Sequence, residues 1–371
     1  MASNNRIFGL DVLRALAILL VVASHCTYLL VAETSHPLFL FIRSLGAVGV
    51  DLFFVLSGYL IGGILLNMIN HGKTTFPDLF TFWKRRWLRT LPNYFLILLF
   101  NILLVSITTQ KLPDTVWRYV LFLQNFTTPH PDFFTEAWSL SIEEYAYLIY
   151  PFIVYLLFVF IKKQSQQVFL WGVVVTILIL LLIKVEFYVS APNISSYKAW
   201  SASFRKVVIY RLDSIYIGFL LYYAINRFSA FFRARRIELF VLSFLMFSGV
   251  HLWMYLDNIQ VTNHLWFYVF GYLPLVMLCC AAVFPFCIHL KPYGKIRGVF
   301  YYLSTRSYAI YLVNYSLILL YVQNYFQDEV FNNLFSFGLI ILYLAITILL
   351  SELLYTFFEK PILKFRDKTF T

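Results

Sequence analysis

The residues that could do chemistry begin in the first apolar stretch of the chain, 7–31, which carries Asp11, Arg14 and His25. An unpaired charge deep in a bilayer costs about 2.5–3.5 kcal/mol, so ionisable side chains there usually face the interior of a helix bundle and serve a function. In a helix, Arg14 and His25 fall within about 20° of one face and about 16 Å apart along the axis, and Asp11 adjoins Arg14. We therefore predict one polar stripe from the inner boundary past the middle of the membrane. The alternative is a snorkelling arginine and a structural histidine.

A second candidate is the run of basic and aromatic residues at 82–92, FWKRRWLRTLP. If this run is helical, Arg85 and Arg89 stack four residues apart, and Arg86 and Arg89 lie three apart. Planar guanidinium groups bind phosphate through paired hydrogen bonds. The arginines therefore predict a site for a phosphate-rich ligand. The alternative is an ordinary positively charged anchor at the inner membrane surface.

A third set of charged residues is expected at the depth of His25, on four different helices. Its members besides His25 are Asp51, Glu143, Glu144, Arg211 and Asp213, and Trp138 precedes the two glutamates. A carboxylate that hydrogen-bonds an imidazole fixes its tautomer and raises its basicity, as a general base requires. We predict a buried polar site in which Glu143 orients His25, provided that these helices pack around a common centre.

Small residues mark one face of the second apolar segment, where Ser57 and Gly58 are followed by Gly62. Glycines four residues apart let another backbone approach the helix closely. Two interpretations remain open, a neighbouring helix packed on this face or a ligand chain that runs along it.

These residues must be positioned by helices, because the chain of 371 residues is 61% hydrophobic and only 13% charged, with a mean hydropathy of +0.76. Such a composition excludes an ordinary soluble domain. Segments of alternating hydrophobicity, as in membrane β-barrels, are absent. We predict an all-α polytopic membrane protein with about ten transmembrane helices. The expected spans are 7–31, 45–69, 91–109, 138–161, 168–190, 207–226, 237–257, 265–290, 299–322 and 333–358.

The placement of the 29 lysines and arginines predicts the orientation. Most of them fall in alternate loops that are cytoplasmic if the N-terminus is inside, so both termini are expected in the cytoplasm. The net charge of +11 then reflects topology and contact with anionic lipid, and no nucleic-acid partner is expected. All four cysteines fall in predicted spans, so we expect neither a disulfide framework nor a metal site.

Taken in order along nearly the whole chain, these motifs resemble those of the acyltransferase-3 family of integral-membrane O-acyltransferases. The matching motifs are Arg14-x10-His25, Ser57-Gly58-xxx-Gly62, Arg86-xx-Arg89 with Pro92, Trp138 to Glu144, Arg211 to Asp213, and Glu359-Lys360-Pro361. One position departs from the pattern. Where members commonly carry a histidine after a Tyr-Leu pair in a late helix, this chain has Asn314, and we assign that position no catalytic role.

The resemblance implies transfer of an acyl group, commonly acetyl from cytoplasmic acetyl-CoA, to a hydroxyl of an extracytoplasmic carbohydrate or glycolipid. O-antigen or lipopolysaccharide, peptidoglycan and other surface glycans all fit as acceptors. The location implied is a bacterial inner membrane. We expect one transmembrane acyltransferase domain over 1–371 and no appended soluble domain.

The mechanism that follows from the resemblance uses each motif. Arg85, Arg86 and Arg89 would hold the CoA phosphates, while the pantetheine arm would follow Gly58 and Gly62 past Ser57. His25, oriented by Glu143, would act as general base or carry the acyl group itself. Arg14, partnered by Asp11, would position the donor, and Arg211 would stabilise the oxyanion. A transporter or flippase that uses the buried charges as a relay is the alternative from another class.

Overall fold

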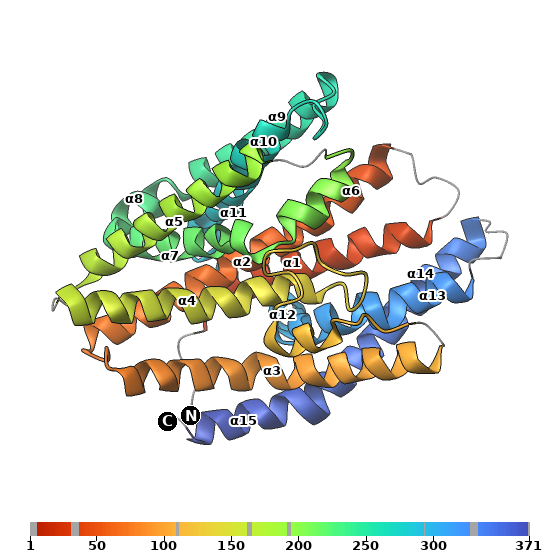
Figure 1. Ribbon diagram of the computed structural model, residues 1–371, viewed down its shortest axis with the longest axis horizontal. Helices are drawn as coiled ribbons and strands as arrows, with labels where there is room; N and C mark the ends of the chain where they lie inside the picture. The colour runs from red at the N-terminus through yellow and green to blue at the C-terminus, as the bar shows by residue number, and fades with distance from the viewer. Residues whose placement is uncertain are drawn as a thin grey trace.

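The structure is a computed structural model that describes residues 6–30, 37–108, 111–161, 165–190, 194–292, 294–326 and 333–369. Within these ranges every regular element is a helix or helical turn (Figure 1). Eight helical segments are long and apolar enough to cross a membrane. The prediction of an all-α polytopic membrane protein is confirmed.

The helices follow the predicted spans closely. The first five spans correspond to α1 (Phe8–Cys26), α2 (Pro37–Asn70), α3 (Phe76–Ile107), α4 (Ala137–Ile161) and α5 (Gln166–Val189). The sixth to eighth correspond to α7 (Leu212–Arg227), α9 (Arg236–Leu256), and α10 (Leu265–Phe267) continued by η5 (Tyr268–Tyr272) and α11 (Leu273–Cys287). The ninth is α12 (Ile296–Val313), η6 (Asn314–Leu319) and α13 (Leu320–Tyr325), and the tenth is α14 (Asn333–Leu353), η7 (Leu354–Glu359) and α15 (Lys360–Thr369). The sixth and ninth are helical but are not among the eight segments of sufficient length and apolarity.

Short elements join the long helices. They are η1 (Thr27–Leu29), η2 (Val116–Leu121), α6 (Tyr197–Trp200), η3 (Ser201–Arg205), η4 (Val208–Tyr210) and α8 (Ser229–Ala234).

Three predicted boundaries are wrong. The second span was expected to begin at residue 45, but α2 begins eight residues earlier, at Pro37. The third span was expected to begin at residue 91, but α3 begins at Phe76, where Thr75 and Asp78 form a reciprocal capping box. The basic run is therefore part of the same continuous helix as the third span. The last helix was expected to stop before Pro361, but the π-helical turn η7 precedes that proline and the chain stays helical to Thr369. A wide turn accommodates a residue that lacks an N–H donor without ending the helix.

The centre of the bundle is built on α2, which packs closely against both α1 and α7 (Figure 1). A Cβ atom on Gly58 would lie 2.0 Å from the carbonyl oxygen of Ile215, and one on Gly62 would lie 2.9 Å from the Cα of Phe219. The glycine face of α2 is therefore filled by the backbone of α7. The hypothesis that an acyl or pantetheine chain runs along this face is wrong, and helix packing is the correct interpretation.

Candidate functional site

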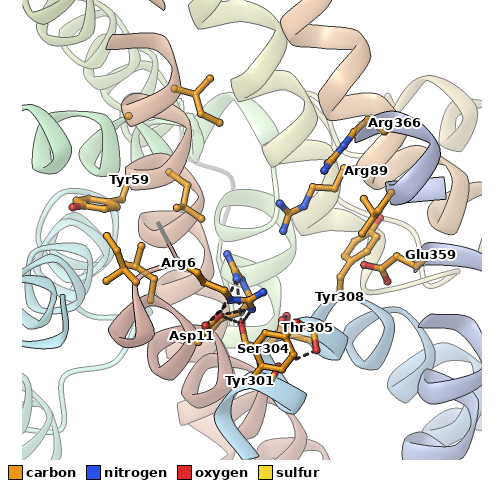
Figure 2. A pocket seen from close by; sticks show the side chains of 18 of the residues that line it. Arg6, Asp11, Tyr59, Arg89, Tyr301, Ser304, Thr305, Tyr308, Glu359 and Arg366 are labelled. Carbon is orange, nitrogen blue, oxygen red and sulfur yellow. Dashed lines mark hydrogen bonds and ion pairs between the residues drawn. The ribbon is translucent and has the colours of Figure 1, made fainter. Parts of the chain in front are cut away.

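One cavity, which we call the arginine cavity, has a volume of about 640 Å³ and lies at the end of the bundle where α1 begins and α15 ends. Four guanidinium groups line it, those of Arg6, Arg14, Arg89 and Arg366. In Figure 2, Arg89 and Arg366 extend into the cavity from one side while Arg6 lies on the other. Tyrosines line much of the remaining wall: Tyr59, Tyr222, Tyr301, Tyr308 and Tyr355.

One carboxylate on α1 organises part of this positive charge. Asp11 accepts hydrogen bonds from Arg6 at 2.7 and 2.6 Å and from the hydroxyl of Ser304 at 2.6 Å. Arg14 lies 3.8 Å from Asp11 and donates to Ser304 at 3.2 Å. Arg6 lies just outside the first span, and its hydrogen bond to Asp11 raises its pKa. The predicted Asp11–Arg14 neighbourhood is confirmed, but the closer partner of Asp11 is Arg6.

A second, narrow cavity of about 100 Å³ continues from the first toward the bundle interior. The two cavities share five lining residues: Arg14, Leu60, Arg89, Ser307 and Tyr308. The narrow cavity is otherwise lined mainly by α2, α3, α4 and α12, through residues that include Ser57, Arg86, Ser139, Glu143 and Tyr311. Together they form a path that is cationic and wide at the end of the bundle and small inside it.

Glu143 belongs to this narrow cavity. Ser57 donates a 2.9 Å hydrogen bond to one of its oxygens, and Tyr147 donates a 3.2 Å bond to the other. Arg86 lies over the ring of Tyr147, 4.9 Å from its centroid, so a positive charge accompanies the carboxylate. The predicted hydrogen bond between Glu143 and His25 is wrong. Glu143 lies instead on the side of α4 that lines the narrow cavity together with Arg86 and Arg89.

His25 hydrogen-bonds instead with Asn314, the first residue of the π-helical turn η6. The Asn314 amide nitrogen donates to the carbonyl oxygens of Ile310 and Tyr311, at 2.7 and 2.8 Å. Its side-chain oxygen also accepts from Tyr343 at 3.2 Å. Because the amide nitrogen is already used, the oxygen faces His25, and Nδ1 of the imidazole is the donor. This arrangement leaves the lone pair on Nε2, the form that a general base needs.

The site at His25 lies one helical turn beyond the narrow cavity. Tyr311 lines that cavity, and Asn314 follows three residues later, a rise of about 4.5 Å along a helix. Tyr311 also shares a 2.7 Å hydrogen bond with Ser139, another cavity residue. The ring of Tyr315 packs beside the imidazole, with 4.8 Å between centroids.

The remaining charged residues predicted at this depth do not form one site. Arg211 is fully buried and pairs with Asp51 at 2.5 Å, while Asp213 pairs with Lys184. Both pairs lie outside the linings of the arginine and narrow cavities. The expected common polar centre is therefore wrong, since each buried charge is neutralised by a partner on an adjoining helix.

Two further predicted residues have local partners. Glu144 accepts a 2.6 Å hydrogen bond from Thr90 on α3. Trp138 is buried, its carbonyl oxygen accepts from Asn125, and the guanidinium of Arg205 lies 4.9 Å from its ring centroid. Glu144 and Trp138 therefore join α4 to its neighbours.

Of the three arginines predicted to bind phosphate, the structure brings Arg86 and Arg89 to the cavities. Arg85 lies outside both linings, because neighbours in a helix point about 100° apart. The sequence analysis did not find Arg6 and Arg366, because only the three-dimensional structure shows that the residue before α1 and a residue of α15 line the same cavity. It also missed Asn314, although its departure from the family pattern was the available signal.

The fold is thus a membrane-spanning helical bundle with two adjoining cavities lined by arginines, and a half-buried histidine one helical turn from the second. The acyltransferase domain model of the acyltransferase-3 family matches residues 7–356, so the chain belongs to this family.

Proteins of similar sequence include O-acetyltransferase OatA of Staphylococcus aureus (strain NCTC 8325 / PS 47), 25% identical over 98% of this chain and 58% of the relative. Another is YrhL of Bacillus subtilis (strain 168), named a putative peptidoglycan O-acetyltransferase, 28% identical over 95% and 54%. The chain thus spans little more than half the length of these relatives. No solved structure matches.

Proposed function

We propose that the protein is a membrane O-acetyltransferase that moves an acetyl group from acetyl-CoA, bound in the arginine cavity, to a hydroxyl of an extracytoplasmic carbohydrate. Family membership supports the reaction class. The observation that carries the proposal is the connected pair of cavities, in which Arg6, Arg14, Arg89 and Arg366 suit the phosphates of the donor.

The donor arm would leave the arginine cavity through the narrow cavity, since the two share the walls at Arg14, Arg89 and Tyr308. Ser57 and Glu143 line this passage and supply hydrogen-bonding groups for the amides of the pantetheine arm. Tyr311 lines this passage and lies one helical turn from Asn314, the hydrogen-bond partner of His25. The thioester would therefore reach the neighbourhood of the imidazole.

Nε2 of His25 would take the proton of the acceptor hydroxyl as its oxygen attacks the thioester carbonyl. The new carbon–oxygen bond forms, the carbon–sulfur bond breaks, and the imidazolium returns its proton to the departing CoA thiolate. The products are the O-acetylated carbohydrate and free CoA. Asn314 holds the ring in the tautomer that starts this cycle.

The acceptor we propose is a surface carbohydrate. The name of YrhL points to peptidoglycan. O-antigen or lipopolysaccharide and other surface glycans are the further candidates. A bacterial inner membrane with both termini in the cytoplasm is the location that fits a cytoplasmic donor and an outside acceptor.

The test uses the purified chain in proteoliposomes with labelled acetyl-CoA on the side of the arginine cavity. Peptidoglycan fragments and lipopolysaccharide are supplied separately on the opposite side, for wild type and His25→Ala. Label on one carbohydrate with wild type and none with His25→Ala is expected, and mass spectrometry identifies the hydroxyl. Equal transfer by a folded His25→Ala variant would refute the role of the histidine. Absence of donor binding would favour a transporter.

A further inference from the structure

A third cavity adjoins the arginine cavity and has no part in the mechanism above. It has a volume of about 330 Å³ and lies between the last turns of α2 and α7 and the first turn of α5. It shares Asn67 and Tyr222 with the arginine cavity, so the two are neighbours. We call it the amide cavity, because four of its eight lining residues are carboxamides: Asn67, Asn70, Gln166 and Asn226.

The lining of the amide cavity differs in kind from that of the arginine cavity. Among the described residues, Arg227 is the one cation in its lining, and none of these lining residues is a carboxylate. A carboxamide offers a donor and an acceptor side by side, the pattern that asparagine and glutamine use on the edge of adenine. Gln166 already donates to Asn70 at 2.7 Å, which orients both amides across the α2–α5 boundary. The cavity therefore suits an uncharged, planar, hydrogen-bonding group.

Tyr222 lines both the arginine cavity and the amide cavity, and two packing contacts fix the position of its ring. A Cβ atom on Gly63 would lie 2.7 Å from the ring of Tyr222, so the absence of a side chain at Gly63 allows the ring to lie against α2. Tyr59 packs edge-to-face on it, with 5.1 Å between centroids. Aromatic rings fixed in this way serve as stacking platforms for bases, each stack being worth about 1–3 kcal/mol.

We propose that the amide cavity binds the adenosine 3′-phosphate end of the acyl-CoA donor; this inference rests on the proposed function. Adenine would contact the amides and Tyr222, and Arg227 would face the 3′-phosphate. The diphosphate would lie among the guanidinium groups of the arginine cavity. The three connected cavities then account for the base, the phosphates and the arm of one donor.

The test compares acetyl-CoA with S-acetyl-4′-phosphopantetheine, which keeps the thioester and arm but lacks the nucleotide. The measured quantity is the ratio of kcat/KM for the two donors. Tyr222→Ala and Gln166→Ala should each lower this ratio about tenfold, through a higher KM for acetyl-CoA. Gln167→Ala is the matched control, since this neighbouring glutamine is exposed and lies outside the cavity lining. Its ratio should equal that of wild type.

The 3′-phosphate is tested separately with acetyl-dephospho-CoA. Wild type should prefer acetyl-CoA over this donor, and Arg227→Gln should remove the preference. Unchanged ratios in Tyr222→Ala, Gln166→Ala and Arg227→Gln would overturn the inference. An equal loss with all donors would overturn it too, because the variants would then act on the fold. If wild type transfers acetyl from no donor, the proposed function itself fails.

Discussion

His25 donates a hydrogen bond from Nδ1 to the side-chain oxygen of Asn314, and the other bonds of that amide fix this direction. A carboxylate in the same place would also stabilise the positive imidazolium. A neutral amide fixes the tautomer without adding a buried charge, whose desolvation inside the bundle is costly. In the mechanism proposed above, the imidazolium would therefore be short-lived, which suits a base that returns its proton to the CoA thiolate.

Asn314→Ala should lower kcat about 10- to 100-fold with little change in the KM for acetyl-CoA, because the imidazole loses its tautomer partner and not the donor site. Steady-state transfer of labelled acetyl to the carbohydrate measures both constants. Tyr343→Phe is the control, since it removes only the second bond to the same amide oxygen. A wild-type kcat in Asn314→Ala would show that the amide does not position His25.

The cationic entrance predicts different effects for neighbouring arginines. Arg89→Ala should raise the KM for acetyl-CoA about tenfold or more, because its guanidinium lines both the arginine and narrow cavities. Arg85→Ala should change this KM less than about twofold, since Arg85 is not in the lining of either cavity. The two variants each remove one arginine, and thus the same charge, from the same helix. Similar effects of the two variants would mean that only the overall positive charge matters.

The pair formed by Arg211 and Asp51 should act on stability. Asp51→Asn leaves a fully buried guanidinium without its counter-ion, which typically costs about 3–5 kcal/mol. Thermal unfolding in detergent should therefore show a large fall in Tm. The double variant Asp51→Leu with Arg211→Met, which removes both charges, should recover most of it. A stable Asp51→Asn protein with lost activity would instead return Arg211 to a catalytic role.

Much of the architecture could be predicted from the sequence, because hydrophobic length and charge placement determine which segments span a membrane. The stripe of Asp11, Arg14 and His25 also followed from helical geometry alone. Arg86 and Arg89 were correctly predicted to face a common site. In each case the evidence was local, within one helix.

What failed was the pairing between helices. Depth in the membrane does not reveal which face of a helix meets which neighbour, so Glu143 was wrongly assigned to His25. A glycine face is equally compatible with a ligand and with a helix, and only the contact of Gly58 with Ile215 decides between them. That Arg6 and Arg366 line one cavity depends on the whole path of the chain. These relationships depend on the tertiary structure and could not be predicted from a single sequence.

The close contact of α2 with α7 predicts that Gly58→Ala damages the fold. Its Cβ atom would overlap the Ile215 carbonyl, and overpacking of this kind usually costs about 1–3 kcal/mol or more. Expression and Tm in detergent should both fall. Gly249→Ala on α9 is the matched control, because nothing lies within 4 Å of its added Cβ and alanine favours the helix. Equal Tm values for the two variants would contradict the packing described here.

Glu136, in the loop just before α4, should make stability depend on pH. Its carboxylate accepts a 2.7 Å bond from the hydroxyl of Ser316 in η6, but burial dominates and raises its pKa from 4.5 to about 7. The folded protein therefore keeps this proton at pH values where the unfolded chain has lost it. The resulting stabilisation is complete below about pH 4.5 and is lost as pH rises toward about 7.

Glu136→Gln replaces the neutral acid with a neutral amide and should remove this dependence. The Tm of wild type should fall between pH 5 and pH 8 by several degrees more than that of Glu136→Gln, measured by thermal unfolding in one detergent. Glu238→Gln, at an exposed glutamate of α9, is the control and should follow the wild-type curve. Parallel curves for wild type and Glu136→Gln would show that the carboxyl titrates as it does in the unfolded chain.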